Sequence, residues 1–129
     1  MLFRSGDEGV ILHGAVRILR GERIYGDYFA FPPPAAFLMP AGWMAAFGVS
    51  VISVRLLALT VIAAIASLTF LCCLRTSASF RLALALPLAW TVLAQGFLVI
   101  VSHHWLTTLC SQLTIWLTLR AMDRGERVA

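Results

Sequence analysis

Two adjacent carboxylates near the amino end, Asp7 and Glu8, are the residues of this sequence best suited to chemistry. Neighbouring anions raise each other's proton affinity or attract a divalent cation, and either property suits a catalytic base or a metal site. The pair also has a simpler use. Glu8 follows Ser5 in the spacing of a helix capping box, and Asp7 favours the positive end of a helix dipole. The spacing therefore predicts either a catalytic or metal-binding pair, or the start of a helix.

His103 and His104 form a second candidate site, between two apolar segments. Imidazoles can bind a metal ion, bind phosphate or transfer a proton. Adjacent side chains on a helix point about 100° apart, so both rings are poorly placed for one ion. Histidine beside Trp105 is also typical of a membrane interface without any chemistry. A binding role and a purely interfacial role both stay open.

Three further polar residues lie where they could contact a substrate. Arg55 opens an apolar segment, so it could hold a phosphate or simply extend to lipid headgroups. Tyr25 and Asp27 fall in an irregular segment, where exposed polar side chains often bind ligands. A hydrogen bond within the loop is the simpler explanation for these two.

The segments that must position these residues are strongly apolar. Of 129 residues, 60% are hydrophobic and 12% charged, whereas soluble domains carry about 25% charged residues. The net charge of +4 comes from arginines that flank apolar runs, which suits lipid headgroups and argues against a nucleic-acid partner. The three cysteines have neither a disulfide framework nor zinc-site spacing, and we expect them to pack among apolar side chains. The composition predicts an integral membrane protein.

The hydrophobic pattern predicts helices throughout. An amphipathic helix is expected over residues 9–20, ending at Gly21 and lying flat on a membrane. Residues 35–48 span roughly 21 Å as a helix, short of the ~30 Å hydrocarbon core, so we expect a re-entrant or interfacial helix. Longer apolar runs predict three transmembrane helices at about 51–75, 81–102 and 103–121.

We therefore expect an all-α fold, a multi-pass transmembrane helical bundle with interfacial juxtamembrane helices. Its parts would be an outer loop with amphipathic and re-entrant juxtamembrane helices at 1–48, three transmembrane helices within 49–122, and a cytoplasmic tail at 123–129. Arginines at 75 and 81 and in the tail predict that these ends face the cytoplasm. The histidine turn then lies on the outer side. Acidic and glycine residues soon after Met1 predict no cleavable signal peptide.

The order of several short motifs resembles the N-terminal part of the GT-C membrane glycosyltransferases, including the protein O-mannosyltransferase and aminoarabinose-transferase branches. The motifs begin at Asp7 and are D-E-G-x-x-L-x-x-A-x-x-I-L-x-G-x-x-x-Y-x-D-Y-F-x-x-P-P, then F-G-V-S and V-R-L-L-A-L. The resemblance covers Asp7 to about Arg75 and extends more loosely to the later spans. The resemblance implies inverting transfer of a sugar from a polyprenyl-phosphate donor to the hydroxyl of a glycan, lipid or protein acceptor. It also implies a multi-pass protein of the plasma (inner) membrane that serves the cell envelope.

The resemblance assigns roles to the candidate residues. Asp7 corresponds to the family's acidic catalytic base or metal contact, with Glu8 beside it. Arg55, His103 and His104 are candidates for the donor phosphate. Family members have a membrane helix before the acidic pair and many spans afterwards, so we expect an N-terminal fragment whose isolated activity is reduced or absent. The alternative is a small non-enzymatic integral membrane protein, such as an assembly partner or transporter subunit.

Overall fold

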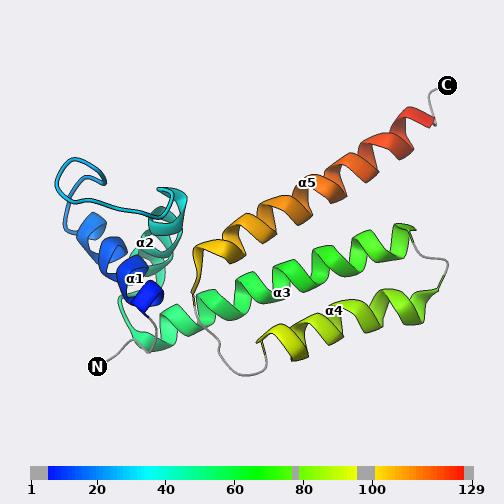
Figure 1. The fold of residues 1–129 in the computed structure, drawn as a ribbon, viewed down its shortest axis with the longest axis horizontal. Coiled ribbons are helices and arrows are strands. Elements are labelled where there is room, and N and C mark those ends of the chain that lie inside the picture. Colours follow the sequence, from blue (N-terminus) through cyan, green and yellow to red (C-terminus); the bar gives the residue numbers. More distant parts are fainter. Residues whose placement is uncertain (1–5, 77–78, 96–100, 127–129) are drawn as a thin grey trace. The chain divides into compact units, whose positions relative to one another are not determined.

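The computed structural model describes residues 6–76, 79–95 and 101–126, and in these ranges the chain forms five α-helices and no strand (Figure 1). The helices are α1 (Gly6–Leu19), α2 (Ala35–Phe47), α3 (Val51–Thr76), α4 (Phe80–Gln95) and α5 (His103–Glu126). The predicted all-α class is confirmed. The chain divides into unit 1, formed by Met1–Thr60 with Val99–Leu106, and unit 2, formed by Val61–Leu98 with Thr107–Ala129.

In unit 1, α1 buries the apolar side that the sequence pattern indicates. Ile11, Leu12 and Ala15 are at most 1% exposed, because residues three and four apart lie on one face of a helix. α1 ends at Leu19, and the turn that follows contains Gly21, whose φ of +90° favours glycine. Its N–H donates to the carbonyl of Ile18 at 2.9 Å. The side that we expected to rest on a membrane is therefore covered by protein.

The close packing of α1 on α2 depends on Gly14. Phe37 of α2 is 1% exposed, and its ring lies so near that a Cβ on Gly14 would stand 2.4 Å from Cδ1 and 2.6 Å from Cε1. Tyr28, from the connecting loop, packs edge-on against Phe37 with ring centroids 6.4 Å apart. Its hydroxyl donates to the carbonyl of Gly14 at 3.3 Å.

Gly14→Ala is expected to lower the free energy of unfolding by about 1 to 3 kcal/mol, because the added methyl overpacks a fixed aromatic ring. Gly42→Ala is the matched control, since a Cβ at Gly42 on α2 meets nothing within 4 Å. That change should raise stability by roughly 0.5 to 1 kcal/mol through helix propensity. Thermal unfolding of both variants in detergent micelles checks the pair. Equal effects would contradict the close contact.

The connection from α2 to α3 is short and well bonded. Gly48 has a φ of +85°, and its N–H donates to the carbonyl of Met44 at 2.8 Å. Ser50 caps α3, since its hydroxyl accepts from the N–H of Ser53 at 3.1 Å. The indole N–H of Trp43 donates to the carbonyl of Ser53 at 2.9 Å. These bonds fix the start of α3 beside the end of α2.

In the described residues, α3 is the helix long and apolar enough to cross a membrane. Its 26 residues extend about 39 Å at ~1.5 Å each, beyond a hydrocarbon core of ~30 Å. The described part of α4 has only 16 residues; residues 96–100 of the predicted second span lie outside the description, and Val101 and Ser102 belong to no helix, so the predicted end of that span at residue 102 is wrong. α5 has 24 residues, but polar and charged side chains interrupt it. The prediction of three spans is therefore supported for α3 alone.

In unit 2, α3 and α4 run antiparallel (Figure 1), joined by edge-on packing of Phe70 against Phe80 with centroids 5.9 Å apart. Arg75 of α3 forms an ion pair with Asp123 of α5, so the carboxyl ends of these two helices meet. The cytoplasmic side predicted for these arginines stays a prediction. Six serine and threonine hydroxyls of unit 2 each donate a hydrogen bond to the backbone carbonyl four residues earlier, so these polar groups are satisfied inside apolar helices. The residues are Ser67, Thr69, Thr76, Thr91, Thr114 and Thr118.

Candidate functional site

A buried ion pair joins three segments of unit 1. Glu8 of α1 has 0% of its side chain exposed, and its Oε1 lies 2.7 Å from Nη1 of Arg55 on α3. A second bond runs from Nη2 of Arg55 to Oε2 at 3.4 Å. The backbone N–H of Val101, just before α5, donates to Oε1 at 3.2 Å. One carboxylate therefore holds the start of α1, α3 and the entry to α5 together.

The geometry explains how a charged group can stay in this core. A carboxylate removed from water is strongly unfavourable unless ionic and hydrogen-bond partners replace the water. Glu8 has a forked guanidinium and a backbone N–H, while the side chain of Arg55 keeps 33% of its surface exposed. Arginine suits this position because its planar fork can bind both carboxylate oxygens.

As it stands, Glu8 does not fit a metal site or an open catalytic base. Both of its oxygens accept hydrogen bonds from Arg55, and its side chain has no exposed surface. Among the described residues, no group of three or more His, Cys, Asp or Glu side chains could hold a metal ion. A metal at the acidic pair, as the sequence analysis considered, would require Glu8 to exchange its arginine partner for the ion.

Asp7 lies in the first turn of α1, but its side chain is outside the described part of the chain. The capping-box alternative depends on Ser5, which is also outside it. What the structure adds is that the carboxylate of Glu8 is directed to α3 and to Val101. The helix start that carries Asp7 is thereby fixed in place.

His103 and His104 are the first two residues of α5. Their ring centroids are 3.9 Å apart with planes tilted by 39°, which is closer than the divergence expected of adjacent helical side chains. At the first position of a helix no preceding turn restricts χ1, so the rings can approach. Val101, which binds Glu8, stands two residues before His103. The acidic motif and the histidine turn therefore belong to one unit, although the buried Glu8 itself does not face an open cavity.

Tyr25 and Asp27 make hydrogen bonds within the loop. The hydroxyl of Tyr25 donates to the carbonyl of Pro32 at 3.2 Å. Oδ2 of Asp27 accepts from the N–H of Arg23 at 2.7 Å, a common way for aspartate to stabilise a turn. Both contacts agree with the simpler of the two explanations, and a substrate contact for either residue stays a prediction.

A polar cluster beside α1 was not predicted from the sequence. Nε of Arg17 donates to Oε2 of Glu22 at 2.5 Å, and its guanidinium lies 4.3 Å from the ring centroid of Tyr28. A small cavity of about 130 Å³ is lined here by residues that include His13, Arg17, Tyr28 and Phe37. Arg17 lies in the last turn of α1 and Glu22 lies beyond the helix. Helical periodicity therefore does not predict that these two residues form an ion pair.

Burial raises the pKa of the Tyr28 phenol above its ordinary value of 10.0, and the cation of Arg17 opposes this only in part. A group whose folded-state pKa is raised stabilises the fold below the unfolded pKa and loses that contribution as pH rises through the folded value. The free energy of unfolding should therefore fall above about pH 10. Tyr28→Phe should make the decline shallower in denaturation at pH 8 to 11. An unchanged decline would contradict this assignment.

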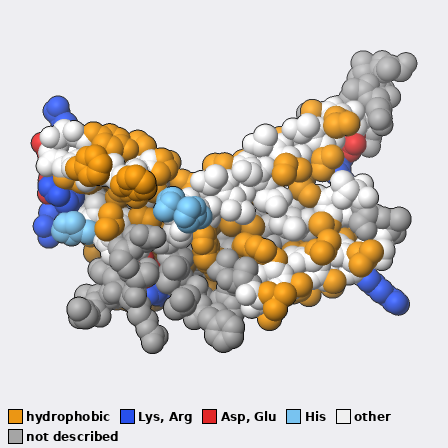
Figure 2. Space-filling model, viewed as in Figure 1, with side chains coloured by type: hydrophobic (Ala, Val, Ile, Leu, Met, Phe, Trp, Pro, Cys, Tyr) orange, Lys and Arg blue, Asp and Glu red, His pale blue; other side chains and the backbone are white. Residues whose placement is uncertain are grey.

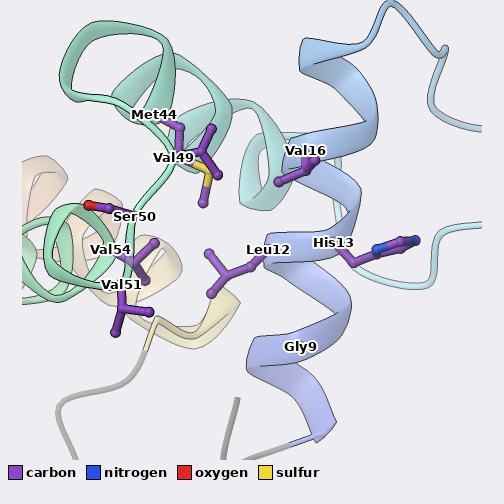
Figure 3. A pocket seen from close by; sticks show the side chains of 9 residues that line it. All are labelled: Gly9, Leu12, His13, Val16, Met44, Val49, Ser50, Val51 and Val54. Atoms are coloured by element: carbon purple, nitrogen blue, oxygen red, sulfur yellow. The ribbon is translucent and has the colours of Figure 1, made fainter. Parts of the chain in front are cut away.

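Unit 1 also contains an apolar cavity of about 460 Å³ (Figure 3). It is lined by Gly9, Leu12, His13 and Val16 of α1, Met44 of α2, and Val49, Ser50, Val51 and Val54. Figure 3 shows Leu12, Met44 and Val54 directed into it, whereas the imidazole of His13 points away. A volume of this size is within the usual range for small-molecule sites, and its lining suits an apolar group.

The chain was compared with protein-family models, curated proteins and solved structures. No family model matches the chain, and neither the curated proteins nor the solved structures include a significant match.

Proposed function

We propose that the chain is part of a GT-C type membrane glycosyltransferase, which transfers a sugar from a polyprenyl-phosphate donor to an acceptor hydroxyl at the outer membrane face. The observation that carries the proposal is the bond set around Glu8. It gathers the acidic motif, Arg55 and the segment leading to His103 into one unit. These are the residues to which the resemblance assigns acceptor activation and phosphate contact.

In this proposal the two carboxylates have different roles. Asp7 accepts the proton of the acceptor hydroxyl as it attacks the anomeric carbon, a contribution of roughly 10² to 10⁴ in rate. Glu8 is a positioning residue, because its contacts with Arg55 and Val101 hold the start of α1. The exposed part of Arg55, with His103 and His104, stabilises the phosphate that leaves.

The membrane provides the setting for this reaction. α3 crosses the bilayer, and α4 and α5 complete a multi-pass arrangement in the plasma (inner) membrane. Many large apolar side chains on α3 and α4 are exposed, among them Leu59, Leu71, Leu82, Leu86, Val92 and Leu93. Such surfaces suit lipid contact. The apolar cavity beside α1 offers space for part of an isoprenoid chain.

The test reconstitutes the full chain in phospholipid vesicles with a radiolabelled, photoreactive polyprenyl-phosphate sugar. We expect crosslinking to unit 1, competed by unlabelled polyprenyl phosphate but not by a nucleotide sugar, and transfer of label to an acceptor hydroxyl. Absence of specific crosslinking would overturn the proposal. Crosslinking without transfer would support the donor assignment but reject catalysis by this chain alone.

One observation favours a second candidate, a non-enzymatic membrane protein that acts as an assembly partner or transporter subunit. Glu8 is fully engaged by Arg55 and Val101, as expected of a residue that only stabilises a fold. This candidate predicts no competed crosslinking of the lipid-linked sugar. The same vesicle experiment therefore separates the two.

A further inference from the structure

The loop that joins α1 to α2 exposes two large aromatic side chains. Phe29 and Phe31 are each 88% exposed, whereas Ala30 between them is 6% exposed. Alternate residues of an extended segment point the same way, and a residue before proline, such as Phe31, is held extended. The buried Ala30 thus lies between two exposed rings in this short segment. We call residues 25–31 the aromatic loop.

The aromatic loop is anchored at several points, so its exposed rings are presented by a fixed backbone. Tyr28 contacts Phe37 and Gly14, and the hydroxyl of Tyr25 binds the carbonyl of Pro32. The N–H of Tyr25 also donates to the carbonyl of Tyr28 at 3.0 Å. The prolines that follow restrict the chain further. Exposing two phenylalanines on an ordered loop is unfavourable in water, which indicates an apolar surrounding.

The charges beside the aromatic loop indicate which surrounding this is. Arg20 and Arg23 are exposed, and Glu22 is paired with Arg17. Asp27 accepts a hydrogen bond from the N–H of Arg23 and keeps its charge, so residues 17–31, with three arginines and two carboxylates, carry a net charge of +1. Two exposed cationic side chains and two exposed aromatic rings thus belong to the same short connection between α1 and α2. Figure 2 shows hydrophobic side chains at the surface over this loop and α2, with arginines beside them. Aromatic rings at the acyl boundary and arginines at the phosphates are typical of a membrane interface.

We propose that the aromatic loop inserts Phe29 and Phe31 into the headgroup and acyl boundary of an anionic bilayer, with Arg20 and Arg23 bound to lipid phosphates. The apolar side of α1 is unable to do this, because Ile11, Leu12 and Ala15 are buried against protein. The lipid-contacting element of unit 1 is then the loop instead of the amphipathic helix. This inference does not depend on sugar transfer.

The test places a tryptophan at the loop and measures its depth. Phe31→Trp in the full chain is reconstituted into vesicles whose lipids carry bromine on the acyl chain near the headgroup, and emission is compared with the unsubstituted chain to remove the native tryptophans. We expect the added emission to be blue-shifted and quenched at least about twofold by brominated lipid, and little affected by iodide.

Charge dependence gives the second readout. Quenching should be stronger in anionic than in zwitterionic vesicles, and Arg20→Gln with Arg23→Gln should remove most of that difference, because each arginine contributes about fivefold in binding to an anionic surface. Arg81→Gln removes one exposed arginine from unit 2 and is the matched control, expected to change nothing at position 31. Quenching by iodide alone would overturn the proposal. Emission that neither brominated lipid nor iodide quenches would also overturn the proposal, because it would indicate that a protein partner or a second copy covers the loop.

Discussion

Arg55→Met is expected to lower the free energy of unfolding by about 3 kcal/mol, because it leaves the carboxylate of Glu8 buried without its cation. Removing one partner of a buried ion pair typically costs about 3 to 5 kcal/mol. Arg55 is partly exposed, with 33% of its side chain accessible, and solvent screening places the value at the lower end of that range. Chemical denaturation of the full chain in detergent micelles, followed by far-ultraviolet circular dichroism, measures the change.

Replacing the two partners of the ion pair should destabilise the protein unequally. Glu8→Gln should cost less, about 1 to 2 kcal/mol, because the arginine left behind can still reach water whereas Glu8 cannot. Arg81→Met is the matched control, since Arg81 is exposed on α4, and a change within about 0.5 kcal/mol is expected there. A loss for Arg55→Met no larger than for Arg81→Met would show that the pair does not stabilise unit 1.

Asp7→Asn is expected to reduce sugar transfer by roughly 10² to 10⁴ with little loss of donor crosslinking, because an amide cannot accept the acceptor's proton. Folding should be retained, since the contacts that fix α1 are made by Glu8. The measurement is initial rate in vesicles that show transfer with the wild-type chain. Raising the pH should not restore the variant.

Two comparisons keep the roles of the carboxylates apart. Asp123→Asn removes a carboxylate from the ion pair with Arg75 in unit 2, and it should keep wild-type transfer. The transfer rate of Glu8→Gln should fall only in proportion to its folded fraction. At a temperature where this variant is fully folded, its transfer rate should equal that of the wild-type chain. If Asp7→Asn retained full transfer, the assignment of the base would be contradicted.

Local sequence signals predicted much of the helical framework. The period of Ile11, Leu12 and Ala15 marks the buried face of α1, and glycines with positive φ stand where α1 and α2 end. The same pattern did not reveal what covers that face. A hydrophobic stripe is equally suited to lipid and to a protein neighbour, and the neighbour here is created by the tertiary packing of α1 on Phe37.

The ion pair of Glu8 and Arg55 also depends on tertiary packing, so the sequence predicted its residues but not their contact. Glu8 and Arg55 were each recognised as candidates, but they are separated by 47 positions, and no local period relates residues so far apart. The pairing with Arg55 holds the carboxylate of Glu8 in the core, where it is not exposed as a catalytic base. The exposed rings of Phe29 and Phe31 were likewise hidden in an irregular segment, where periodicity predicts no face at all.

The bonds of Glu8 to Arg55 fix the start of α1 within unit 1. The most direct test is a double-mutant cycle with Glu8→Gln, Arg55→Met and the double variant, measured as free energies of unfolding in detergent. We predict a coupling free energy of about 2 kcal/mol or more, with the double variant more stable than Arg55→Met alone, because it no longer buries an unpaired charge. Additive effects, with a coupling near zero, would contradict the account.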